Sequence, residues 1–139
     1  QPPGHPPRPV HPDIPDGVRE SLAEAEACFS ASAWNASVVM ARRALEGAAM
    51  LLGAPRRGNL VVWLHEQGHV TKVVLVYADH VRWVGTLGAH FPDEGQKDEH
   101  VVLEDDARAA FDFMHMILET IFVAKARLDR LRITKGATQ

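Results

Sequence analysis

Apolar residues recur every three or four positions along most of the chain, and this spacing predicts five helical segments. The first two segments, residues 16–30 and 34–52, carry the stripes Val18, Leu22, Ala25 and Phe29, then Val38, Ala41, Leu45, Ala48 and Leu52. Asp13 or Asp16 is placed to cap the first helix, and Gly53 is placed to end the second. The small polar run between them predicts a bend.

Capping residues mark two further helices. Asn59 is a good N-cap for a short third helix, which Gly68 ends. Thr71 is the predicted cap of a fourth helix, and Gly85 and Gly88 weaken the far end of that helix. The apolar residues of the two helices are Leu60, Trp63 and Leu64, then Val74, Leu75, Ala78, Val81 and Trp83.

The last predicted helix has the charge polarity that a helix dipole favours. Its first turn holds Glu104, Asp105 and Asp106, its stripe holds Ala107, Ala110, Phe111, Met114, Ile117, Leu118 and Ile121, and its last turns hold Lys125, Arg127, Arg130 and Arg132. The β-branched runs 73–76 and 101–103 would also suit short strands. The cap at Thr71 and the acidic helix start favour helices instead, so we predict an all-α bundle of about five helices.

The N-terminal segment differs in composition from the rest. Residues 1–15 hold seven of the nine prolines. Proline fixes φ and lacks a backbone donor, so this segment is predicted to be an extended arm or linker. The helical domain is predicted to cover residues 16–132, with a C-terminal tail at 133–139. Because the chain begins with Gln1, we expect an upstream domain or partner.

Composition narrows the classes of function. The formal net charge of −3 argues against a protein that coats nucleic acid through bulk electrostatics, while a local basic site stays compatible with it. The lone Cys28 excludes an internal disulfide. No apolar run approaches the ~18–20 residues of a membrane span, and the N-terminus lacks the pattern of a signal peptide. We therefore expect a cytoplasmic protein without membrane contact.

Five blocks of sequence follow one another in a recognisable order. They are Ala41–Glu46, Glu66–Thr71, Arg82–Gly85 with Ala89–His90, Glu104–Ala107 and Ile121–Arg127. Together they resemble a bacterial family, the domain of unknown function 4145 (DUF4145), which is a branch of the HEPN superfamily (higher eukaryotes and prokaryotes nucleotide-binding). The resemblance covers roughly residues 13–132. It implies an HEPN-like helical bundle.

The resemblance also implies a function. Many HEPN proteins are metal-independent ribonucleases of toxin, antiviral and restriction systems, and they commonly dimerise so that two catalytic signatures face each other. The signature is an arginine with a histidine a few positions on, and Arg82 and His90 stand where it belongs. Trp83 replaces the usual polar residue, Thr86 replaces the usual asparagine, and the Arg-to-His spacing is longer than in the active nucleases. The resemblance thus implies a homodimer in bacterial defence or stress that cuts RNA, or a degenerate relative that binds it.

Arg82 and His90 are our candidate catalytic residues. The guanidinium of Arg82 would hold the scissile phosphate, and the imidazole of His90 would act as general base or acid at the ribose 2′-hydroxyl. On a straight helix, eight residues separate their Cα atoms by ~12 Å along the axis and by about 80° around it. They can therefore meet if the helix breaks at its glycines, or if a second chain supplies the histidine. Arg43, Glu46 and Thr86 are candidates to line the same pocket.

A second function also fits these residues. Arg82 could form a structural ion pair with Asp79 or Glu46, and His90 could cap a helix. The domain would then be a non-catalytic dimerisation or interaction module that serves a larger protein. The tryptophan after Arg82 and the acidic net charge favour this alternative, whereas the retained arginine and histidine favour the nuclease.

A third, remote alternative comes from the segment His65–His69, which spells the HExxH pattern of zinc metalloproteases. Such a site needs both histidines on one face of a continuous helix, together with a third ligand. Gly68 is predicted to end the helix before His69. We therefore predict that the chain has no metal site and needs no cofactor.

Overall fold

The computed structural model describes residues 9–56, 58–81 and 102–137, and in these ranges the chain is helical with no strand. The elements are α1 (Asp16–Ser30), α2 (Trp34–Leu51), α3 (Leu60–Glu66), α4 (Lys72–His80), α5 (Glu104–Leu118), the π-helical segment η1 (Glu119–Ala124) and α6 (Lys125–Ala137). The predicted all-α fold is confirmed. Residues 73–76 lie in α4, so the strand alternative there is wrong.

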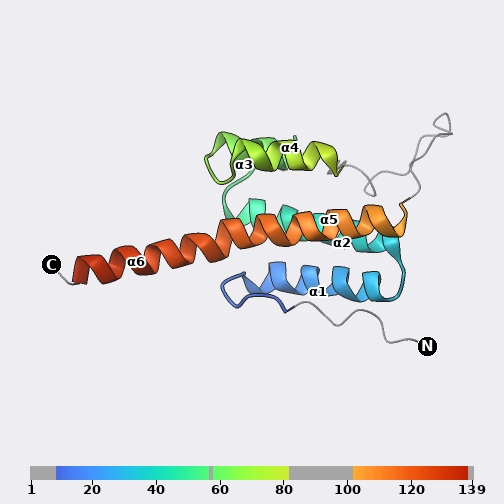
Figure 1. Ribbon diagram of the computed structural model, residues 1–139, viewed down its shortest axis with the longest axis horizontal. Helices are drawn as coiled ribbons and strands as arrows, with labels where there is room; N and C mark the ends of the chain where they lie inside the picture. Colours follow the sequence, from blue (N-terminus) through green and yellow to red (C-terminus); the bar gives the residue numbers. More distant parts are fainter. Residues whose placement is uncertain (1–8, 57, 82–101, 138–139) are drawn as a thin grey trace.

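Helices α1 and α2 form an antiparallel pair (Figure 1). The turn between them places Ser32 at a φ of 62°, a left-handed conformation that non-glycine residues seldom adopt. Small side chains line the contact, and Ala25, Ala44 and Ala48 are fully buried. The buried hydroxyl of Ser37 on α2 donates a hydrogen bond of 3.0 Å to the carbonyl oxygen of Ala25 on α1. The alanines allow close packing, and the serine fixes one register of the two helices.

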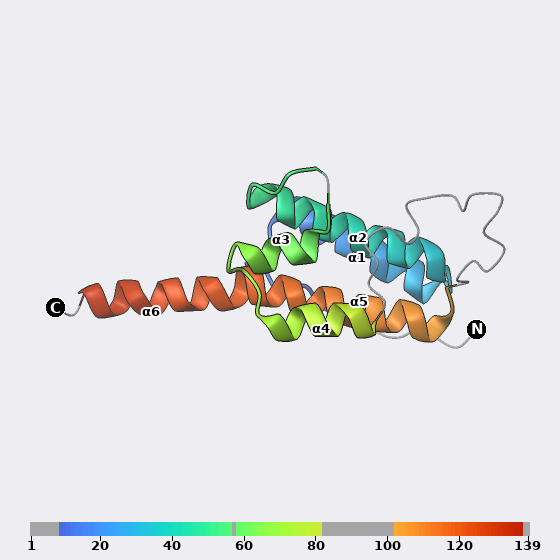
Figure 2. The same cartoon turned by 90° about the horizontal axis from the view of Figure 1, so that it is seen from above.

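Helix α5 is the central element of the core. It contacts α1, α2 and α4, and Figure 2 shows it running beside α4. Four of its side chains are 0 % exposed, namely Phe113, Met114, Ile117 and Leu118. Every residue of the stripe predicted for this helix is buried. Because each such side chain gains roughly 1.5–3 kcal/mol on burial, this helix holds the other elements together.

The structure confirms the predicted cap of α3 and corrects that of α4. The side chain of Asn59 accepts hydrogen bonds from the backbone N–H groups of Val61 and Val62, at 3.0 and 3.2 Å, as predicted. Thr71 occupies the N-cap position of α4, but its hydroxyl makes no capping hydrogen bond. The predicted helix is therefore present, while the predicted role of its threonine side chain is wrong.

The cap predicted for α1 is also wrong. Its N-cap is Pro15, which has no side-chain acceptor. Asp16 instead pairs with Arg19 at 2.8 Å, and Asp13 pairs with Arg130 at 3.4 Å. Each of the two aspartates therefore faces a guanidinium, and the pair between Asp13 and Arg130 connects the segment before α1 to the distant α6.

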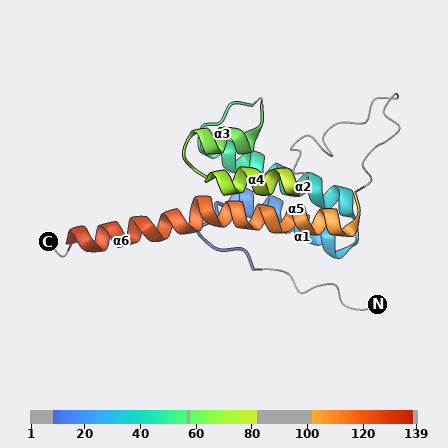
Figure 3. The ribbon, with the colours of Figure 1, turned by 45° about the horizontal axis from the view of Figure 1, so that its top comes forward.

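The last predicted helix contains a π-helical segment, and it continues past this segment without a sharp bend. Elements α5, η1 and α6 form one long rod, and α6 projects away from the bundle (Figures 1 and 3). Apolar side chains on this projecting part are exposed, including Leu128 at 47 %, Leu131 at 62 % and Ile133 at 71 %. None of the helices in the described ranges is long and apolar enough to cross a bilayer.

Two leucines on this rod give a matched test of the core. Leu118 is 0 % exposed and Leu131 is 62 % exposed. We expect Leu118→Ala to lower the free energy of unfolding by about 2–5 kcal/mol, because the change leaves a cavity. Leu131→Ala should change it by no more than about 0.5 kcal/mol. Urea unfolding followed by circular dichroism measures both, and equal losses would contradict the assignment of α5 as the core helix.

Candidate functional site

The three residues predicted from the nuclease signature region, Arg82, Thr86 and His90, lie outside the described residues. The described part of the chain reaches the position just before Arg82, since α4 ends at His80 and Val81 is its C-cap. The predicted continuation of this helix to Trp83 also falls outside the described ranges. Among the described elements, α4 leads directly to the signature, and α2 carries the other two pocket candidates.

The two pocket candidates on α2 have different environments. Arg43 is exposed. Glu46 is 43 % exposed, and its Oε1 lies 3.0 Å from Nε of Arg42, four residues earlier on the same helix. The side chain of Arg42 is only 19 % exposed, so this pair is more buried than a surface pair. Of the two neighbouring arginines, Arg42 and not Arg43 is the one enclosed by the fold.

The guanidinium of Arg42 is the less satisfied group of that pair. Its Nη1 atom is buried and has no hydrogen-bond partner among the described residues. A buried guanidinium with donors to spare favours a nearby anion, because desolvation makes an unpaired cation costly. The i,i+4 spacing of Arg42 and Glu46 shows that the two side chains can pair, and it does not show how buried Arg42 is.

The HExxH segment does not have the geometry of a zinc protease. Helix α3 ends at Glu66, and Gly68 follows with a φ of +79°, a left-handed conformation suited to glycine. The predicted helix end is therefore confirmed. His65 lies on the helix, whereas His69 lies beyond the turn and packs against Trp63 at a ring distance of 6.0 Å. The described ranges contain no cluster of three metal-ligating side chains.

A polar groove of about 670 Å³ runs along the rod where α5 passes through η1 into α6. Titratable side chains gather in it, namely His11, Asp112, His115, Glu119 and Arg127. His115 is 4 % exposed and its ring meets that of Phe111 edge-on at 4.6 Å. The groove brings two imidazoles, two carboxylates and a guanidinium to one place.

The π-helical segment explains why the sequence did not indicate this groove. A π turn adds one residue to the turn, so side chains after it point in directions that α-helical spacing does not predict. Thr120, within this segment, donates to the carbonyl oxygen of Met116 at 2.9 Å. His115 and Arg127 fall on either side of the segment, and their twelve-residue separation gave no helical signal. The histidine inside an apolar stripe was the one hint in the sequence.

Helix α6 is strongly cationic. Between Lys125 and Ala137 it holds five basic residues and one acidic residue, a net charge of +4 in a chain of net charge −3. The basic residues are Lys125, Arg127, Arg130, Arg132 and Lys135, and all are exposed. The positive charge is therefore concentrated on the part of the molecule that projects farthest from the core.

Comparison with known proteins identifies the family. The family model described as "Domain of unknown function (DUF4145)" matches residues 23–134, which is most of the chain. The chain belongs to the DUF4145 family. No curated protein and no solved structure matches it. The DUF4145 match begins within α1 and ends within α6, so it includes most of the core, of the polar groove and of the cationic helix.

Removal of metal should leave this DUF4145 protein unchanged, because the two histidines of the HExxH segment are separated by the end of α3. We expect the same melting temperature with and without a chelator, for wild type and for His65→Ala. Thermal unfolding followed by circular dichroism, together with elemental analysis, measures this. One equivalent of zinc that is present in wild type and lost in His65→Ala would overturn the interpretation.

Proposed function

We propose that the chain is an HEPN-like, RNA-binding domain that cuts RNA without a metal ion. Its DUF4145 family membership and the resemblance of Arg82 and His90 to the HEPN signature support this. We place it in the cytoplasm of bacteria, in defence or stress, as a homodimer. The observation that carries the proposal is the concentration of positive charge on α6.

Helix α6 suits a phosphate backbone. Its cations are spread around the helix and not confined to one face, so they would meet an RNA strand through charge and not through a fitted pocket. The net charge of the whole chain is negative, so nonspecific electrostatics of the domain cannot supply the attraction. Arg127 also borders the polar groove, so one cation of α6 lies where this helix leaves the bundle.

The chemistry at the proposed centre needs two groups. The imidazole of His90 takes the proton of a ribose 2′-hydroxyl, and the 2′-oxygen attacks the adjacent phosphorus. The bond from phosphorus to the 5′-oxygen breaks, and this oxygen takes a proton from solvent or from a second imidazole. The guanidinium of Arg82 stabilises the charge that develops on the phosphoryl oxygens. The products are a 2′,3′-cyclic phosphate and a 5′-hydroxyl.

RNA binding can be tested through its dependence on salt. The double variant Arg127→Gln/Arg132→Gln should weaken binding to single-stranded RNA and make the slope of log K against log salt shallower by about 1.4, since each phosphate that is no longer neutralised changes the slope by about 0.7. Fluorescence anisotropy measures both quantities. Arg19→Gln on the acidic α1 is the matched control and should leave the slope unchanged. Equal slopes for all three proteins would contradict a role for α6.

Cleavage is tested separately. With chelator present, wild type should convert single-stranded RNA to fragments that end in a cyclic phosphate. His90→Ala should reduce the rate by about 10²–10⁴-fold, and Arg82→Ala should reduce it while RNA binding through α6 remains. Gel assays with end-labelled RNA measure the rates. Absence of cleavage by wild type would contradict the proposed nuclease activity. RNA binding would then be decided by the salt experiment alone.

The second candidate function is a non-catalytic dimerisation or interaction module. A specific observation favours it, because the outward face of α4 exposes apolar side chains, with Val73 at 72 % and Val76 at 46 %. Such a surface suits contact with protein and not with RNA. It is compatible with the first proposal, since a domain can dimerise through one face and bind RNA through another.

A further inference from the structure

Helix α4 is apolar on two faces, and the fold uses one of them. Val74 and Ala78 point into the core and are 6 % and 7 % exposed. Away from the core, Val73 and Val76 are 72 % and 46 % exposed, and Tyr77, at the border between the two faces, is 36 % exposed. Apolar side chains that gather on an exposed face of a helix mark a contact surface. The outer face of α4, defined as Val73, Val76, Tyr77 and His80, therefore has the composition of a buried surface.

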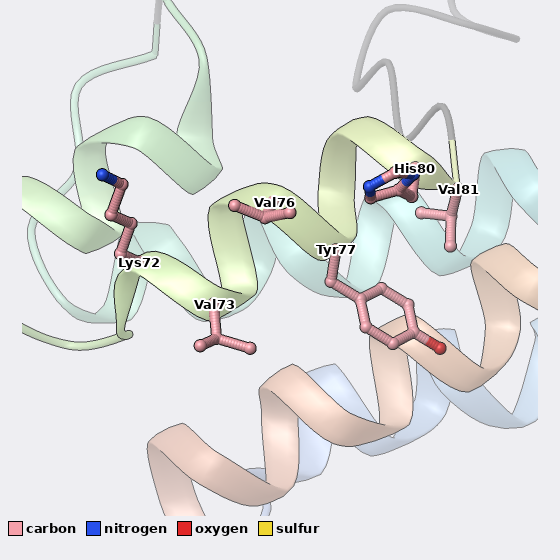
Figure 4. Close-up of a pocket in the computed structure, with 6 residues that line it drawn as sticks. All are labelled: Lys72, Val73, Val76, Tyr77, His80 and Val81. Carbon is pink, nitrogen blue, oxygen red and sulfur yellow. The ribbon is translucent and has the colours of Figure 1, made fainter.

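The outer face is also hollowed. Figure 4 shows Val73 and Tyr77 pointing to the side of α5, with Val76 and His80 above them on the helix and Lys72 at one end. These residues border a shallow groove of about 460 Å³. The ring of Tyr77 stacks on that of Phe113 in the core at 5.3 Å, which holds it in place beside the groove. A preformed apolar surface of this kind loses little conformational entropy on docking.

The charges at the ends of α4 oppose the helix dipole. Lys72 is the first residue, at the positive end, and Asp79 is next to last, at the negative end. Within the described residues, neither makes an ion pair. Seven residues complete nearly two helical turns, so these two side chains lie only about 20° apart around the axis. They therefore border the same edge of the outer face, with opposite charges at its two ends.

This arrangement is complementary to itself. When two copies of α4 pack antiparallel through their outer faces, the two-fold axis passes through Val76, and residue 72 of one copy lies level with residue 80 of the other. Lys72 of each copy then meets Asp79 of its partner along one side of the contact, twice by symmetry. The charges that are unfavourable in the single chain become two ion pairs beside an apolar seam.

We propose that the outer face of α4 is the interface between two copies of this chain, paired antiparallel about Val76. The inference deepens the proposed function, which rests on two copies that bring their signatures together. It draws on the polarity and charge of α4 alone. Because α4 has only nine residues, the contact is at the small end of specific interfaces, and we expect a dimer that dissociates on dilution through the micromolar range.

Sedimentation equilibrium of the full chain tests the interface. Val76→Glu places two like charges at the symmetry axis and should weaken dimerisation by at least about 100-fold. The matched control is Val62→Glu on the neighbouring α3, where the valine is 39 % exposed, and it should dimerise like wild type. Circular dichroism checks that both variants remain folded. A wild-type chain that is monomeric at all concentrations, or equal weakening by both variants, would overturn the proposal.

A charge exchange tests the antiparallel register. Lys72→Asp should weaken the dimer, because it places two acidic groups together at each end of the contact. Lys72→Asp combined with Asp79→Lys should restore it, because each new charge again meets its opposite on the partner. Failure of the double variant to recover would exclude this register. The RNA assays separate the two proposals. RNA cleavage by monomeric Val76→Glu would show that cleavage does not need two copies, and it would leave the interface standing. A wild-type dimer that neither binds nor cuts RNA would contradict the proposed function and would also leave the interface standing.

Discussion

The burial of α5 against α1, α2 and α4 is the contact on which the rest of the structure depends. Phe113 and Met114 on this helix are 0 % exposed, and α5 contacts both helices of the α1–α2 pair as well as α4. Once α5 is seated, the direction of the continuous rod that follows it is fixed as well.

This constraint separates the two surfaces proposed to be functional. The rod is anchored by its first half, so α6 is held away from the bundle without a core of its own, and its cations remain exposed. On another side of the core, Val74 and Ala78 of α4 are buried while Val73 and Val76 of the same helix are exposed. One buried helix therefore leaves a cationic arm and an apolar face accessible, which suit an RNA strand and a second copy of the chain respectively.

Periodicity predicted the parts of the fold in which one side of a helix is buried. The stripe from Ala107 to Ile121 was found because burial on α5 follows helical spacing. Features that helical spacing does not encode were missed. Asp13 pairs with the distant Arg130 instead of capping α1, and the side chain of Arg42 is only 19 % exposed. The polar groove was missed because a π turn changes the direction of the side chains that follow it.

Of the site predicted from sequence, Arg43 and Glu46 lie among the described residues, and the signature that carries the chemistry does not.

Mapping of ultraviolet crosslinks between the full chain and single-stranded RNA is the most direct test of RNA binding through α6. We expect crosslinked nucleotides on peptides from residues 125–135, because the exposed cations of α6 would hold the backbone there. Peptides from the acidic α1 should carry none. Crosslinks confined to α1, or spread evenly over the surface without enrichment on α6, would contradict the claim that this helix is the RNA-binding arm.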